Sequence, residues 1–139
     1  MSRPDDIARH VLRLDWDDVP PASQAAMKAF LLDTLAVGVA GRRAWLSDEI
    51  LSAAQGWGEA GAGPAARVFG GGPVLPAASA AFVNGFQIHC QEYDCVHEPA
   101  VVHPMAVIAA AVSSEAEARD APGAAYLAAL TGAVDVAAG

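Results

Sequence analysis

The chain is poor in positive charge. Of its 139 residues only 8 are Lys or Arg, against 16 Asp and Glu, and the formal net charge is -8. No Lys or Arg occurs between Arg67 and Arg119. An acidic surface repels phosphate backbones and anionic lipid headgroups, so the composition argues against nucleic acid and against a membrane as partner.

Long apolar runs are also missing, although apolar residues make up 54% of the chain. No run reaches the ~18 residues that a bilayer span needs. The N-terminus, MSRPDDIARH, lacks the apolar stretch of a secretory signal. Cysteine is scarce: Cys90 and Cys95 lie close together in sequence, and nothing indicates secretion. We therefore expect reduced thiols in a cytoplasmic protein.

What the chain does contain is helix-forming sequence, rich in Ala together with Leu and Val. The clearest helix is predicted over residues 23–40, with Ser23 as N-cap and Gly41 as stop. Its apolar surface extends so far around the helix that we expect it to be central. Its one interior acid, Asp33, is expected to cap or pair rather than to catalyse.

Further helices are predicted from the same periodicity, with Pro and Gly between them. They cover residues 5–14, 46–57 (capped by Ser47), 76–91, 104–117 and 124–138. Residues 56–64 are expected to be a flexible loop, 66–69 extended, and 70–73 a turn without the GK[ST] ending of a phosphate loop. Residues 1–139 are thus predicted to form one all-α domain, an up-and-down bundle of about five or six helices.

Chemically active side chains concentrate in residues 84–104, NGFQIHCQEYDCVHEPAVVHP. Surface charge usually has mixed signs, whereas the acids of this stretch have no Lys or Arg nearby in sequence. The stretch therefore predicts a functional site at the end of an apolar helix. Its titratable residues include His89, Cys90, Glu92, Asp94, Cys95, His97, Glu98 and His103.

One interpretation of this stretch is a metal site. The pattern C-x4-C-x-H-x5-H that begins at Cys90, with His89 and Asp94 nearby, offers enough ligands for Zn²⁺. Its spacing matches no standard zinc finger or ribbon.

A second interpretation is a metal-free acid–base site. Imidazole exchanges protons near neutral pH, and a carboxylate beside it can orient it or share the work. His103 precedes Pro104 at a predicted helix start, where a substrate carboxylate can bind without Lys or Arg. In a third, structural interpretation, His89 and His97 are hydrogen-bonded loop residues; His10 is expected simply to lie on the surface.

The same residues carry a resemblance. The pattern NG-x3-H-x2-E-Y-D-C-x-H-x5-H-P resembles the hallmark of the MmgE/PrpD family of lyases, NG-x3-H-x2-D-[FY]-D-D-[TV]-H followed by His-Pro. LLDTLAVGVAG at residues 31–41 is similar to a second signature of that family. The resemblance covers nearly the whole chain and implies the N-terminal helical domain of a family that includes 2-methylcitrate dehydratase, cis-aconitate decarboxylase and iminodisuccinate epimerase.

The resemblance assigns roles to five residues. Glu92, Asp94 and His103 occupy positions of the family's catalytic pocket. His103 is then the general acid or base, while Asp94 and Glu92 orient it or handle the leaving hydroxyl. His97 or His89 is expected to contact substrate oxygens.

Three positions depart from the family's pattern. Glu92 is one methylene longer than the usual Asp, Cys95 replaces a further Asp and removes its charge, and Val96 stands where some members have Thr. These departures bear on the substrate but retain an acid–imidazole pair.

The resemblance implies a hydro-lyase of the 2-methylcitrate dehydratase type that acts on a small polycarboxylate, with decarboxylation or epimerisation as alternatives. It implies no metal, no cofactor, and a homodimer. Family members are much longer and carry a lid domain, so we expect this chain to be an incomplete and inactive fragment. The expectations from other classes are a non-catalytic helical dimerisation module and a zinc-binding module.

Overall fold

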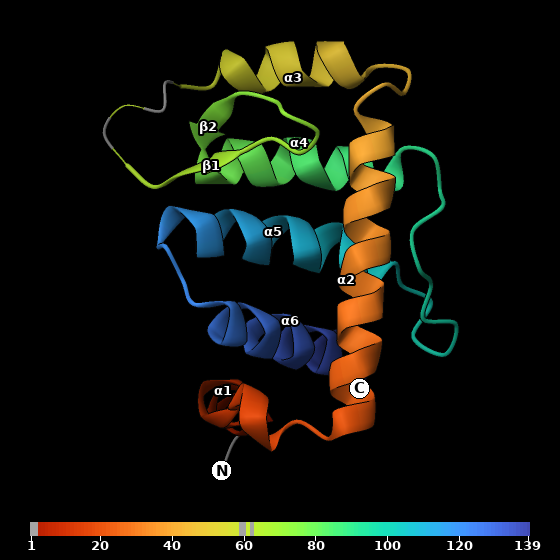
Figure 1. Cartoon of the computed structure of the whole chain (residues 1–139), viewed down its shortest axis with the longest axis vertical. Helices are drawn as coiled ribbons and strands as arrows, with labels where there is room; N and C mark the ends of the chain where they lie inside the picture. The colour runs from red at the N-terminus through yellow and green to blue at the C-terminus, as the bar shows by residue number, and fades with distance from the viewer. Residues whose placement is uncertain (1–2, 59–60, 62) are drawn as a thin grey trace.

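The computed structural model describes residues 3–58, 61 and 63–139. In this part of the chain there are six α-helices and one small two-stranded sheet, which lies beside α4 (Figure 1), and this confirms the all-α prediction. None of the helices in these residues combines the length and apolar character of a membrane span. The helices are α1 (Arg3–Arg13), α2 (Pro21–Gly41), α3 (Ser47–Gln55), α4 (Ala77–His89), α5 (Pro104–Ala118) and α6 (Gly123–Ala138), with a 3-10 turn, η1, at Trp16–Asp18.

Helices α2 and α5 begin at prolines, and α3 begins at a serine that bonds to the end of α2. Pro21 and Pro104 are the first residues of α2 and α5, a position where the missing N–H costs no hydrogen bond. The predicted Ser23 cap is therefore wrong, because α2 begins two residues earlier. Ser47 is also not a cap: it is the first residue of α3, and its hydroxyl donates to the Gly41 carbonyl at 2.6 Å.

The sheet is a short hairpin. Strand β1 (Ala65–Arg67) pairs antiparallel with β2 (Val74–Pro76). The predicted turn between them is confirmed, with Gly70 and Gly71 at φ 72° and 78°, a region that suits glycine. Strand β2 was not predicted, because three residues are too few to show an alternating pattern. Residues 59, 60 and 62 of the predicted loop lie outside the described residues.

Helices α3, α4, α5, α6 and α1 lie in successive layers, and α2 runs across their ends (Figure 1). Consecutive helices α4, α5 and α6 pack as neighbours, as expected of a bundle. The core forms two clusters on either side of α4. One contains Ile88 with Met105 and Leu130, and the other contains Val83 with Leu51.

The expectation that the helix of residues 23–40 is central is wrong. Helix α4 is the enclosed element, whereas α2 keeps Phe30, Leu32 and Val39 exposed. Apolar side chains of α2 extend beyond its buried face, so the width of its apolar surface does not show that the helix is enclosed. The buried face of α2 contains Met27 and Thr34.

Small residues allow α4 to approach both of its neighbours closely. A Cβ placed on Gly41 of α2 would lie 1.9 Å from the carbonyl oxygen of Gln87 in α4. On the other side, a Cβ on Gly85 of α4 would lie 3.2 Å from the carbonyl oxygen of Ala106 in α5. These contacts fix the C-terminal end of α4 beside the start of α5, and the candidate site lies there.

Candidate active site

His89 is the last residue of α4, and His103 is the residue that precedes α5. Because α4 and α5 pack closely at Gly85, their ends bring the two imidazoles together, with ring centroids 4.8 Å apart in an edge-to-face arrangement. Both side chains remain partly open to solvent, with 47% of His89 and 33% of His103 exposed.

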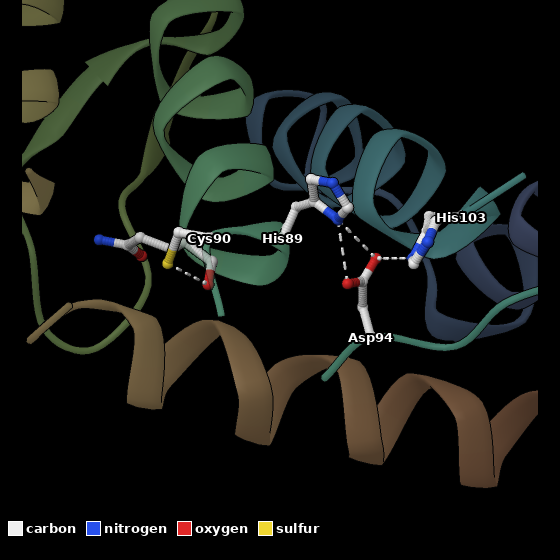
Figure 2. Close-up of polar contacts among 5 residues, drawn as sticks. His89, Cys90, Asp94 and His103 are labelled. Atoms are coloured by element: carbon white, nitrogen blue, oxygen red, sulfur yellow. Dashed lines mark hydrogen bonds and ion pairs between the residues drawn. The ribbon is translucent and has the colours of Figure 1, made fainter. Parts of the chain in front are cut away.

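Asp94 lies between the two imidazoles (Figure 2). Its carboxylate oxygens are 3.1 and 3.3 Å from Nδ1 of His89, and Oδ2 is 3.2 Å from Nδ1 of His103. The Asp94 side chain has no exposed surface. One buried carboxylate thus bridges two histidines that come from different helices.

The contact with Asp94 determines which nitrogen of each imidazole ring carries the hydrogen. An ionised carboxylate can only accept hydrogen bonds, so each Nδ1 that contacts Asp94 must carry the hydrogen. In the neutral tautomer this leaves Nε2 with a free lone pair. His89 and His103 can therefore each accept a proton at Nε2 while Asp94 holds the ring in place.

The loop between the two helices is itself braced. His97 and Val102 form an antiparallel bridge, with the His97 N–H donating to the Val102 carbonyl at 2.9 Å. The ring of His97 accepts at Nδ1 from the Ala100 N–H, at 3.3 Å. Glu92 and Val101 both have φ 54°, a left-handed conformation that non-glycine residues rarely adopt. The loop thus makes two sharp turns on its way from α4 to α5.

The region around Asp94 is negative. Burial raises the pKa of the Cys95 thiol, and the nearby charges of Asp94 and Asp33 raise it further. Within the described residues no Lys or Arg forms an ion pair with Asp94, whose partners are the two histidines. Asp33 is exposed in the middle of α2, and the described residues show no side-chain hydrogen bond to it, so the expected cap or pair is not observed.

The structure gathers three of the five predicted site residues: His89, Asp94 and His103. Glu92 lies exposed at the turn after α4, where its main-chain N–H donates to the His89 carbonyl at 2.8 Å; in the part of the chain described, its side chain makes no hydrogen bond to this cluster. His97 lies in the loop bridge rather than in the cluster. The roles predicted for Glu92 and His97 stay predictions.

The thiols do not join the cluster. Cys90 and Cys95 are free. The Cys90 thiol donates to the Gln87 carbonyl at 3.5 Å, within its own helix end. Burial raises the pKa of Cys90, with a smaller contribution from the charge of Asp94. Within the described residues, the possible metal ligands that lie together are therefore His89, Asp94 and His103, and not those of the sequence pattern that begins at Cys90.

Comparison with known proteins decides the family. The family model described as the MmgE/PrpD N-terminal domain matches residues 5–139. The chain belongs to the MmgE/PrpD family. Comparisons with curated proteins and with solved structures gave no match. In this MmgE/PrpD domain the hallmark stretch contains Asn84 and Gly85, which support α4, as well as the histidines and the aspartate that form the cluster.

The sequence indicated each member of the cluster but not the pairing of His89 with Asp94. The available signal was that His89 ends one helix and His103 begins the next, with a short loop between them. Without the packing of α4 on α5, that signal does not tell which of several acids lies between the histidines.

Proposed function

We propose that this MmgE/PrpD protein is a lyase of the 2-methylcitrate dehydratase type, which removes a proton next to a carboxylate of a small polycarboxylate and expels water. The observation that carries the proposal is the buried Asp94 carboxylate, which holds His89 and His103 side by side. Membership of a family with lyase members supports it.

His103 is the general base in this proposal. A proton next to a carboxylate is weakly acidic, so its removal needs a base that is already in position. Nε2 of His103 takes the proton, while Nδ1–H stays on Asp94. The carboxylate then stabilises the imidazolium ion that forms.

His89 is the second imidazole of the site. In its protonated form it contacts the substrate hydroxyl and gives the proton with which that group leaves as water. The carbon–hydrogen and carbon–oxygen bonds break, and a carbon–carbon double bond forms. We assign His97 to a further contact with substrate oxygens, and Glu92 to the leaving hydroxyl beside His89.

The negative charge around Asp94 opposes the binding of an anionic polycarboxylate, so positive charge must be supplied at the site. The N-terminus of α5, directly after His103, is the cationic end of a helix and favours one substrate carboxylate. We propose that the remaining positive charge comes from outside the residues of this cluster.

The proposal is tested by incubating the protein with 2-methylcitrate, citrate and cis-aconitate, following the unsaturated product by absorbance and measuring CO₂ release. Unsaturated product without CO₂ supports the dehydratase, whereas CO₂ or an inverted centre selects the decarboxylase or epimerase alternative. In parallel, the imidazole resonances of His89 and His103 are followed by NMR, because bound substrate shifts them even without turnover. If the protein shows no turnover and these resonances do not shift, the proposal is contradicted and a non-catalytic helical module is favoured.

A homodimer in the cytoplasm remains part of the proposal. Exposed apolar side chains on α2, among them Phe30 and Leu32, are compatible with a covered surface. Light scattering after gel filtration measures the mass, and a monomer at all concentrations would remove the dimer from the proposal.

A further inference from the structure

We propose that His89, Asp94 and His103 also bind one divalent transition-metal ion of the zinc class, and that the bound ion blocks the acid–base role of the two histidines. Ion binding at this cluster goes beyond the proposed function and does not rest on it, whereas the block of acid–base chemistry rests on the proposed function. One ligand atom from each of the three residues lies within 4.8 Å of the other two. Two imidazoles and one carboxylate are a common ligand set for Zn²⁺ and its neighbours.

The distances suit an ion as well as a hydrogen bond. Charge-assisted hydrogen bonds between nitrogen and carboxylate oxygen are about 2.7–2.9 Å long. Two ligands at ~2.0–2.2 Å from a tetrahedral zinc ion lie roughly 3.3–3.5 Å apart. The observed separations between Nδ1 and the carboxylate oxygens are 3.1 to 3.3 Å, nearer to the second case. The contacts of each ring with Asp94 thus need little change, whereas the widest separation among the three ligand atoms, up to 4.8 Å, must shorten by about 1 Å for all three to reach one ion.

Charge favours the same conclusion. Asp94 has no exposed side-chain surface, and within the described residues its carboxylate is accompanied by imidazoles and not by Lys or Arg. A buried carboxylate is costly unless a positive charge or good hydrogen bonds compensate it. A divalent cation supplies the charge that this part of the chain lacks.

The exposure of the two histidines leaves the site open to an ion. Asp94 is covered, but His89 and His103 are 47% and 33% exposed, so an ion can enter from the side of the imidazoles and keep a water as fourth ligand. Two other possible ligands make contacts of their own: Nδ1 of His97 accepts from the Ala100 N–H, and the Cys90 thiol donates to the Gln87 carbonyl.

Ion binding and acid–base chemistry exclude one another here. The ion takes the Nδ1 lone pairs, so in each neutral ring the hydrogen that faced Asp94 moves to Nε2, which then has no free lone pair to accept a proton. The ion also takes the carboxylate that orients both rings. An occupied site therefore cannot use Asp94 to hold a free base, and we expect zinc to inhibit turnover in a manner that a chelator reverses.

The test is a titration of the purified, metal-free chain with Zn²⁺ by calorimetry and with Co²⁺ by visible absorption. We expect one ion per chain and the visible bands of Co²⁺ with nitrogen and oxygen ligands. His89→Ala and His103→Ala should each weaken binding by more than about tenfold, since even loss of an outer-shell partner typically costs that much. His10→Ala is the matched control and should bind as the wild type does.

Three results would overturn the inference: no ion bound by the folded wild-type chain, equal losses in the control and cluster variants, or loss of binding in Cys90→Ser/Cys95→Ser. The last result would instead assign the ion to the thiols. Circular dichroism of each variant confirms folding, and His89→Ala is the most informative variant because this side chain is half exposed. The readout is ion binding, so it is independent of whether the dehydratase proposal holds.

Discussion

The side-chain oxygen of Asn84 accepts a hydrogen bond from the main-chain N–H of Phe69, at 2.8 Å. Its amide nitrogen donates to the carbonyl of Arg67 at 3.1 Å, and the side chain is fully buried. Asn84 thus ties the end of β1 to α4, five residues before His89. The hallmark asparagine therefore has a structural role that supports the candidate site from behind.

Replacing Asn84 with Ala should destabilise the fold. It leaves a main-chain N–H and a carbonyl without partners, so we expect the free energy of unfolding to fall by about 2–4 kcal/mol. Urea unfolding followed by circular dichroism measures the change. Gln91→Ala, which removes an exposed amide close by, is the control and should change the free energy by less than about 0.5 kcal/mol. Equal effects of the two substitutions would contradict the role of Asn84.

Gly41→Ala should be destabilising because α2 and α4 touch there. The new Cβ would lie 1.9 Å from the Gln87 carbonyl oxygen, so the helices must separate. We expect a loss of about 1–3 kcal/mol or more. Gly123→Ala serves as the control, since a Cβ at Gly123 meets nothing within 4 Å. Urea unfolding followed by circular dichroism measures the loss. If the urea midpoint of Gly41→Ala equals that of the wild type, the helices do not approach this closely.

His103→Ala should reduce turnover in the active protein by roughly 10²-fold or more, because the general base is lost. Steady-state kinetics on the substrate identified by the panel measure the effect. His10→Ala is the matched control: His10 is exposed and pairs with Asp135 at 3.0 Å, away from the cluster. Turnover that is unchanged in His103→Ala removes this residue from the mechanism.

Asp94→Asn should lower kcat by about 10²-fold or more while the substitution keeps the side-chain shape. An amide carries no charge and has an NH₂ donor in place of one carboxylate oxygen, so it holds the two Nδ1–H groups less strongly and does not stabilise an imidazolium ion. Nitrogen NMR of the imidazoles reports the tautomers of His89 and His103 directly. If kcat falls while both tautomers stay as in the wild type, Asp94 acts in some way other than by orienting the rings.

Stability should fall at alkaline pH. Burial raises the pKa of Cys90 and Cys95 above the ordinary 9.0, and that of Tyr126 above 10.0, the last despite a hydrogen bond with Ser113. The folded protein then holds these protons more tightly than the unfolded chain, so their contribution is intact below the unfolded pKa and is lost as the pH rises through the folded values.

Urea unfolding over a series of pH values from neutral to above 9.0 checks this prediction. The double variant Cys90→Ser/Cys95→Ser should lose less stability over the same range. The prediction is contradicted if the free energy of unfolding of the wild type stays constant or increases as the pH is raised above 9.0.

The helices themselves were largely predictable. Pro104 and the Ala-rich segments mark α5 from local sequence, and the glycines at 70–73 mark the turn of the hairpin. These features depend on backbone conformations that a residue favours wherever it stands. An error arose at Ser47, where a contact across the turn between α2 and α3 determined the local structure: its hydroxyl bonds to Gly41 instead of capping α3.

By itself, the sequence determined the all-α class, the family, and the concentration of histidines and acids in residues 84–104. Only the tertiary structure decided that α4 is enclosed and α2 crosses it, because the apolar residues of a helix do not show which neighbours cover it. Only the tertiary structure placed Asp94 between His89 and His103. That bridge depends on the close packing of α4 and α5 at Gly85, a contact between residues distant in sequence that no local pattern encodes.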